Sequence, residues 1–210
     1  MVYLGGFFFK EIYYIQYLFI MKKVFYIFLL MFYAVCASAQ TVNFKLQKNG
    51  YFVTEDGMDY VVVEYEGKTA SELYSMVKSN IIELYNDPSK VMSENEPSKI
   101  VINAMAGNIY STYKPFVGFI SYSAYYKYIF MFKDGKIRIN APYVKQDLYV
   151  PGWQGTFSGL VRHWFDEDGK VKSEQQANVS KMELIFIYPI NLILGVESSV
   201  EENVEEDWDW

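Results

Sequence analysis

An Asp134-Gly135 turn between two aromatic and β-branched runs is the feature that most constrains how this sequence folds. Residues 122–132 and 137–139 read as strands, because Tyr, Phe and Ile favour the pleated surface of a sheet. Asp-Gly between two such runs is a strong hairpin signal, since both central residues of a type I′ turn need positive φ. We therefore expect these strands to pair antiparallel within a larger antiparallel sheet.

The longer of the two strands is bulky on both faces, because alternate residues of a strand point to opposite sides. One face carries Tyr126, Tyr128, Phe130 and Phe132. The other face carries Tyr125, Lys127, Ile129 and Met131. This pattern predicts a strand that is central in the sheet or covered on both sides. Its tyrosines, from Tyr122 to Tyr128, either pack as cross-strand and core residues or line a carbohydrate or peptide groove.

The clearest helix of the sequence begins after Gly67. Thr69 and Glu72 have the spacing of a capping box, in which each side chain accepts a hydrogen bond from a backbone N–H group at the start of the helix. An apolar stripe at helical spacing follows, made of Leu73, Met76, Val77, Leu84 and Tyr85. Asn86-Asp87-Pro88 should end the helix, and the stripe should pack in the core.

The remaining elements are a set of short strands and one more helix. The strands are expected at residues 42–46, 51–53, 60–65, 90–93 and 99–104. Asn49-Gly50 reads as the turn between the first two of these. The second helix is expected over residues 174–194, kinked or ended by Pro189 near Tyr188, with Gly195 as its C-cap.

Residues 21–40 have the order of a secretory signal peptide. Lys22 and Lys23 form a positive start, an apolar run continues to Val35, and Ala37-Ser38-Ala39 fits the small-x-small pattern that signal peptidase cleaves. We expect cleavage after Ala39, export to the periplasm or the cell surface, and a mature chain that begins at Gln40 or Thr41.

Two alternatives concern the same N-terminal stretch. Residues 1–20 read as a mis-called upstream start, or else as part of one long membrane anchor, although Lys22 and Lys23 interrupt the span of about 20 apolar residues that an anchor needs. Cys36 is an alternative lipid-anchor site, but Val35 precedes it where bacterial lipidation prefers a small residue.

Cleavage changes the chemistry that the chain can carry. Removing residues 1–39 takes away three Lys and one Glu, so the formal net charge deepens from −6 to −8. Affinity for nucleic acid comes largely from Lys and Arg at phosphates, so nucleic acid is not an expected partner. The mature chain has no cysteine, and His163 is its single histidine. This excludes thiol chemistry and metal motifs with several histidines, and we expect no cofactor and no metal.

Side chains that can bind or react gather within residues 153–169. The candidates for ligand binding are Trp153, Arg162, His163, Trp164 and Asp166. Aromatic residues beside Arg suit a sugar or an aromatic ligand, and a histidine beside carboxylates suits general base catalysis. The alternative is a surface hairpin, with residues 162–164 on a strand and residues 166–169 in its turn. No catalytic residue is assigned.

The expected order of elements, β-α-β-β-β-β-α, is that of one half of the TATA-binding-protein (TBP) fold. Together with the signal peptide, YVVVEYEGKTASELY at 60–74 and FMFKDGKIRI at 130–139 carry a resemblance to an uncharacterised secreted bacterial family of unknown function with a TBP-like fold. The resemblance implies an α+β domain over residues 59–195, with a strand lead-in at 40–58. Its antiparallel sheet would have two helices on one face. Residues 150–172 would be an insertion, and residues 196–210 an acidic tail.

The family resemblance implies no activity, and a fold name does not imply DNA binding. We expect an exported, non-catalytic binding or interaction domain that meets a protein or glycan partner at the envelope, with no stable membrane span after signal cleavage. The alternative is a carboxylate-dependent hydrolase that uses the His163 region. That alternative requires His163 and either Asp166 or Asp168 to share a concave pocket.

Overall fold

The computed structural model describes residues 21–23, 41–150 and 153–196. The chain forms two compact units, Met1–Ala39 and Gln40–Trp210. In the first unit residues 21–23 are helical; the rest of the expected signal peptide, Cys36 included, lies outside the described residues, as does the acidic segment 197–210. The described buried core lies wholly between Val42 and Val196, so the second unit carries its own core.

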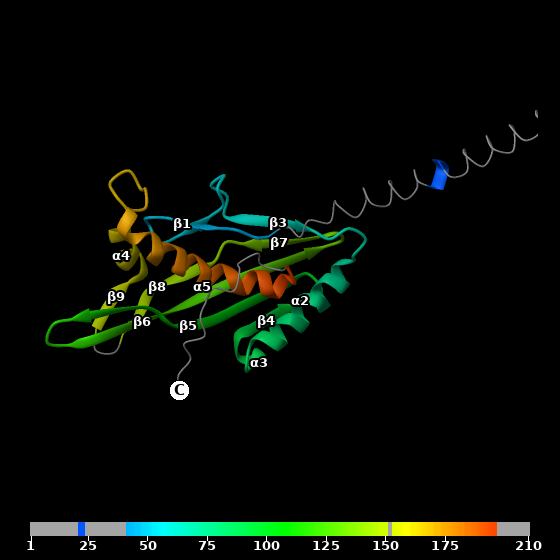
Figure 1. The fold of residues 1–210 in the computed structure, drawn as a ribbon. Coiled ribbons are helices and arrows are strands. Elements are labelled where there is room, and N and C mark those ends of the chain that lie inside the picture. Colours follow the sequence, from blue (N-terminus) through cyan, green and yellow to red (C-terminus); the bar gives the residue numbers. More distant parts are fainter. Residues whose placement is uncertain (1–20, 24–40, 151–152, 197–210) are drawn as a thin grey trace, which may run out of the picture. The chain divides into compact units, whose positions relative to one another are not determined.

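The centre of this unit is an antiparallel sheet of seven strands (Figure 1). They are β3 (Tyr60–Glu64), β4 (Met92–Asn95), β5 (Lys99–Lys114), β6 (Gly118–Lys133), β7 (Lys136–Asn140), β8 (Tyr143–Val150) and β9 (Trp153–Thr156). Five strands lie in the order β3-β7-β6-β5-β4, and β8 pairs with both β6 and β9. The long strand β6 therefore pairs with β7 near one end and with β8 further along.

Two long helices, α2 (Ala70–Leu84) and α5 (Gln176–Leu194), cover one face of the sheet (Figure 1). The capping box predicted for the first helix is confirmed. The Thr69 backbone N–H donates to Glu72 Oε2 at 2.7 Å, and the Glu72 N–H donates to Thr69 Oγ1 at 3.3 Å. The predicted fold class, α+β with an antiparallel sheet and two helices on one face, is thus confirmed.

Strand β6 is central, as predicted, and the described residues cover it on one face only. Tyr128 and Phe130 are fully buried beneath the helices, and the Tyr128 hydroxyl donates to the Phe186 carbonyl of α5 at 2.9 Å. On the opposite face Tyr125 is 52% exposed and Lys127 is also exposed. Among the described residues, the bulky side chains of the second face form an exposed surface rather than a second buried layer.

The hairpin between β6 and β7 is confirmed, but its turn type is not. Lys133 and Lys136 are partners, and Gly135 has a φ of 75°, whereas Asp134 is not in the positive-φ region. A type I′ turn is therefore wrong. The reason is tertiary: the Asp134 carboxylate accepts from the Ala70 N–H at 2.8 Å, which ties the turn to the start of α2.

Strands β5 and β6 extend well beyond the predicted limits of 99–104 and 122–132. The extension crosses a bulge between Ala106 and Tyr110, where Asn108 has a φ of 50°. Asn108 Oδ1 accepts from the hydroxyls of Ser111 at 2.5 Å and Ser121 at 2.7 Å. These local polar residues interrupt the apolar pattern in the sequence, yet they stabilise the bulge that lets the strands continue.

The smaller elements agree with the sequence in part. Strands β1 (Lys45–Leu46) and β2 (Phe52–Val53) form the predicted two-stranded pair, although the first is shorter than residues 42–46. The strand expected at 90–93 is displaced to Met92–Asn95 by a short helix, α3 (Pro88–Val91). Proline at the first helical position favours such a start.

Helix α5 does not end at Pro189, so of the two predicted alternatives the one in which this proline ends the helix is wrong. The helix continues to Leu194, and Gly195 caps it with a φ of 66°, as expected. A proline inside a helix costs about 3 kcal/mol, but burying Ile190, Ile193 and Leu194 contributes roughly 1.5–3 kcal/mol each. Residues 173–194 are long and apolar enough to cross a membrane, and 44% of the most apolar window is buried inside the protein.

The expected insertion, residues 150–172, has more regular structure than a loop. It contains β9, the short helix α4 (Phe157–Val161) and the 3₁₀ turn η1 (Arg162–Trp164). A strand over residues 162–164 is therefore wrong, because this segment continues the helical path of α4. The predicted turn is present: Phe165 pairs with Val171, and Gly169 has a φ of 79°.

Candidate functional site

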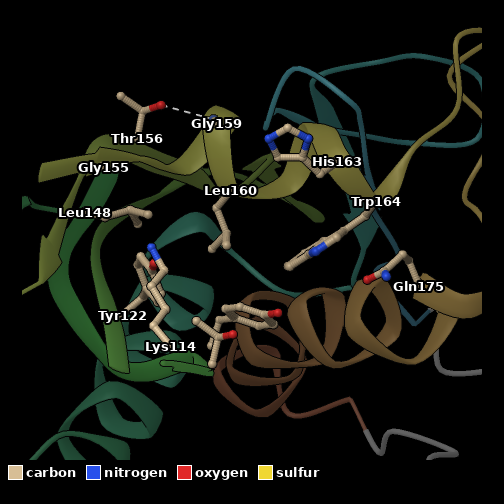
Figure 2. A pocket seen from close by; sticks show the side chains of 12 residues that line it. Lys114, Tyr122, Leu148, Gly155, Thr156, Gly159, Leu160, His163, Trp164 and Gln175 are labelled. Atoms are coloured by element: carbon tan, nitrogen blue, oxygen red, sulfur yellow. Dashed lines mark hydrogen bonds between the residues drawn. The ribbon is translucent and has the colours of Figure 1, made fainter. Parts of the chain in front are cut away.

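A cavity of about 530 Å³ lies between the outer end of the β5–β6 hairpin and the segment from β9 to η1 (Figure 2). The hairpin contributes Tyr110, Thr112, Lys114 and Tyr122 to its lining. The opposite side contributes His163 and Trp164 of η1. The cavity therefore joins two parts of the sequence about forty residues apart.

The bulge in β5 is what brings that strand into the cavity. Ala106 pairs with Ala124, and the next pair is Tyr110 with Tyr122, so three residues of β5 oppose one residue of β6. The bulge therefore adds two residues to β5, and because this number is even, alternate residues stay on the same face of the strand. Tyr110, Thr112 and Lys114 all line the cavity. A bulge also increases the local twist and bends the strand.

An aromatic wall made of Tyr110, Tyr122 and Trp164 runs across the cavity from the β5–β6 hairpin to η1. The rings of Tyr110 and Trp164 are 5.5 Å apart at an angle of 55°, and the rings of Tyr110 and Tyr122 are 6.0 Å apart at 46°. Trp164 is only 4% exposed and supports the wall, whereas the two tyrosines are half-buried. The tyrosine rings are therefore the accessible part of this wall, and the buried indole of Trp164 packs against Tyr110.

Polar groups line the cavity beside this wall. Figure 2 shows Lys114 and Tyr122 on one side of the cavity, and His163, Trp164 and Gln175 on the other. His163 is exposed, and its backbone carbonyl accepts from Lys172 Nζ at 3.0 Å, which fixes the η1 turn to the following loop. Donors and acceptors thus surround an aromatic surface, an arrangement that can hold a ligand with both apolar and hydroxyl-bearing faces.

The first turn of α4, which lines the cavity, is held by a side-chain N-cap. Thr156 Oγ1 accepts from the Gly159 N–H at 3.0 Å, so this hydroxyl is already engaged. A Cβ atom at Gly159 would lie 2.7 Å from the same oxygen, and only glycine fits without displacing the cap. The Ser158 N–H donates to Gln146 Oε1 at 3.0 Å, which ties α4 to strand β8.

Two of the five predicted site residues line the cavity, namely His163 and Trp164. Arg162 is exposed and does not line it. Asp166 closes the neighbouring turn, where its Oδ1 accepts from the Lys170 N–H at 2.8 Å. The side chain of Trp153 lies outside the described residues.

The sequence-based reading missed most of the β5 contribution. Tyr110, Thr112 and Lys114 alternate along the chain, and this period of two was the available signal that the strand continues past Ala104. Gln175 carries no comparable signal, because it lies in the 3₁₀ turn η2 (Ser173–Gln175) before α5.

The tyrosines of β6 divide between three environments rather than lining one groove. Tyr122 lines the cavity, and Tyr125 is exposed on the opposite face of the sheet. Tyr126 and Tyr128 pack beneath the helices, where the Tyr126 and Tyr85 hydroxyls are 3.0 Å apart. Burial raises the pKa values of Tyr126 and Tyr128 above the usual value, so both phenols stay neutral.

Carboxylates are the groups that the cavity lacks within the described part of the chain. Its lining there contains His163 and Lys114 but neither Asp nor Glu. The described residues also hold no cluster of three or more potential metal ligands. The geometry therefore brings His163 together with hydroxyl, amide and aromatic groups, which can bind, and not with a carboxylate at Asp166 or Asp168.

Comparisons with known proteins give information about the fold and not about the site. No family model matches the sequence, and no curated protein matches it. Among solved structures, the chain is similar to a DUF4468 family protein from Bacteroides ovatus ATCC 8483, with 8% identity and a TM-score of 0.48 over 78% of this chain and 94% of that chain. It is also similar to a TBP-like protein from Parabacteroides distasonis ATCC 8503, with 11% identity and a TM-score of 0.43 over 66% of this chain and 92% of that one. One neighbour is a protein of a family of unknown function and the other is described as TBP-like, and both likenesses concern the fold alone.

Proposed function

We propose that the unit Gln40–Trp210 is an exported, non-catalytic binding domain whose ligand occupies the cavity between the β5–β6 hairpin and η1. The observation that carries this proposal is a cavity that brings the half-buried rings of Tyr110 and Tyr122 together with the polar groups of His163 and Gln175. The volume of about 530 Å³ falls within the range of about 300–1,000 Å³ that is usual for small-molecule sites.

The ligand class that fits this lining best is a short glycan. Sugar rings present C–H groups on their faces and hydroxyls at their edges. Tyr110 and Tyr122 offer flat apolar surfaces to the former, and Thr112, Gln175 and His163 offer hydrogen-bonding groups to the latter. The size of the cavity suits a few sugar units rather than a long polymer.

Binding is favoured over hydrolysis by the placement of the acidic side chains. Glycoside hydrolysis ordinarily needs two carboxylates that flank the scissile bond. Within the described residues the cavity lining contains no carboxylate, and the Asp166 carboxylate holds the neighbouring turn. The hydrolase alternative has no comparable observation in its favour.

Export is supported by the sequence order of residues 21–40 and by the division of the chain. The boundary between the two compact units falls between Ala39 and Gln40, the position of the expected cleavage. Fractionation of cells followed by N-terminal sequencing tests this part. The expected result is protein outside the cytoplasm that begins at Gln40 or Thr41, and intact residues 1–39 on the recovered protein would contradict it.

Ligand binding is tested by saturation-transfer difference NMR with maltotriose, cellotriose and chitotriose as probes. At least one probe should receive saturation from the protein, and Tyr122→Ala should strongly reduce the signal. Tyr125→Ala is the matched control, because it removes a tyrosine from the same strand on the opposite face of the sheet. The proposal fails if no probe binds or if Tyr122→Ala binds like the control. Release of shorter sugars from a bound probe would favour the hydrolase instead.

A further inference from the structure

The face of the sheet that points away from α2 and α5 carries an excess of positive charge. Its exposed basic side chains are Lys99, Lys127, Lys133, Lys136, Arg138 and Lys145. The strands place two acidic side chains, Glu64 and Asp147, on the same face. This is the reverse of the whole chain, whose formal net charge is −6. We call the surface formed by these strands the open face.

The charges of the open face are poorly neutralised within the described residues. Lys145 Nζ lies 3.9 Å from the Asp147 carboxylate, a long contact between exposed groups. Arg138 lies over the Tyr60 ring at 4.0 Å from its centroid, which leaves its charge intact. Lys99 and Lys127 form no ion pair with any described residue.

Apolar side chains separate these basic groups. Met131 lies in register between Lys99 and Arg138, and the next outward pair along the strands is Val101 with Ile129. Further along, Met105 and Tyr125 are partners that are 50% and 52% exposed. The open face is thus an apolar strip bordered by cations, which suits a segment that alternates acidic and large apolar residues.

The chain contains a segment of that chemistry directly after the described residues. Among residues 197–210 seven are Asp or Glu and none is Lys or Arg, and the segment ends in Asp207-Trp208-Asp209-Trp210. The described chain ends near an edge of the sheet, because the Leu194 carbonyl accepts from the Tyr65 hydroxyl at 2.9 Å, and Tyr65 directly follows edge strand β3.

The length of the segment is sufficient to reach the open face. An extended chain covers about 3.3 Å per residue, which gives residues 197–210 a reach of roughly 45 Å. Turning around the edge of the sheet takes roughly 10 Å, and crossing from β3 to β5 takes roughly 15 Å, because neighbouring strands lie about 4.8 Å apart. The segment can therefore place both tryptophans over the strip near Ile129 and Met131.

We infer that residues 197–210 bind the open face of the same molecule, with the acidic side chains against the lysines and the tryptophans against the apolar strip. The interaction covers the face opposite the helices. The interaction does not involve the cavity, so a test of this inference is independent of a test of the proposed ligand binding. Because it depends on exposed charges, salt weakens it: the screening length falls from about 8 Å at 0.15 M to about 3 Å at 1 M.

Paramagnetic relaxation NMR tests this inference on the unit Gln40–Trp210, which has no native cysteine and carries its own core. A nitroxide attached at Asn203→Cys should strongly attenuate the amide signals of Ile129 and Met131 in low salt. The attenuation should largely disappear at 1 M NaCl. It should also disappear in the double variant Lys99→Glu/Lys127→Glu, whose spectrum reports at the same time whether the domain is folded.

The matched control is Lys170→Glu/Lys181→Glu, which reverses two exposed lysines outside the open face and should keep the attenuation. Undiminished Ile129 and Met131 signals in low salt would overturn the inference, as would equal attenuation in both double variants. A second sample tests whether the segment binds another molecule instead. It mixes spin-labelled protein at natural isotope abundance with ¹⁵N-labelled protein that carries no nitroxide. Attenuation of similar strength in that mixture would overturn binding within one molecule in favour of self-association.

Discussion

The N-terminal edge of the domain depends on one buried polar residue, and Asn191→Leu tests how strongly. Asn191 is 3% exposed within α5. Its Oδ1 accepts from the Val42 N–H at 2.9 Å, and its Nδ2 donates to the Val42 carbonyl at 3.1 Å. Val42 itself is 1% exposed. This pair fixes the first described residues after the expected cleavage site onto the final helix.

The magnitude of the Asn191→Leu effect can be estimated from these contacts. The variant leaves the Val42 N–H and C=O buried without their side-chain partner, at a cost of about 1–3 kcal/mol for each group. Burying the leucine side chain offsets roughly 1–2 kcal/mol of that cost. The expected net loss in the free energy of unfolding is about 2–3 kcal/mol, or roughly 4–12 °C in the melting temperature of a domain of this size.

The assay is urea denaturation of the unit Gln40–Trp210, followed by tyrosine and tryptophan fluorescence. Asn178→Leu is the matched control: it makes the same change in the same helix, where the side chain bonds only to Gln175 at 2.8 Å. The control should change stability by less than about 0.5 kcal/mol. A loss below about 1 kcal/mol for Asn191→Leu, or equal losses in the two variants, would refute the reasoning.

Three further predictions concern the cap of α4, the cap of α2 and the titration of one tyrosine. Gly159→Ala should cost about 1–2 kcal/mol of stability in urea denaturation, because its Cβ would displace the Thr156 cap; an unchanged midpoint would contradict the assigned cap. Glu72→Ala should lower the urea midpoint, while Glu72→Gln, which keeps the capping oxygen, should recover most of that loss; equal losses would contradict the capping box. Burial raises the pKa of Tyr65 to about 12, above the unfolded value near 10. The contribution of the neutral Tyr65 phenol to the free energy of unfolding is therefore present below pH 10 and is lost as pH rises from 10 to 12. Tyr65→Phe should therefore flatten the fall in stability over that window, and an unaltered pH profile would contradict it.

Local signals account for the parts of the fold that the sequence predicted. The capping box at Thr69 and Glu72 involves residues three positions apart, and the Asp134-Gly135 hairpin joins adjacent strands. In both cases the residues that determine the structure are neighbours in the chain, so pattern and geometry agree. Even there the type of turn depended on the distant N–H of Ala70.

Tertiary packing accounts for the parts that the sequence did not predict. Pro189 favours the end of a helix, but the burial of the residues around it keeps α5 intact. Residues 162–164 were expected on a strand, and the burial of Trp164 against Tyr110 instead holds them in a 3₁₀ turn. Such contacts join residues about fifty positions apart, and no local pattern encodes them.

The candidate site was predictable only on one of its sides. His163 and Trp164 stood out because histidine occurs once and tryptophan is rare in this chain. Tyr110, Thr112 and Lys114 reach the same cavity through the bulge at Asn108, whose polar residues resemble a loop in the sequence. The sequence therefore indicates which residue types could bind a ligand, and the bulge determines which of these residues lie together in the cavity.

The most direct test of the account is a ¹⁵N chemical-shift titration of the unit Gln40–Trp210 with whichever trisaccharide shows saturation transfer. The account predicts that the largest shifts cluster at Tyr110, Tyr122 and His163, and that Tyr122→Ala weakens the dissociation constant by about tenfold, equivalent to about 1.4 kcal/mol. Shifts concentrated instead around Tyr125 and Lys127 on the open face, with the cavity residues unmoved, would contradict it.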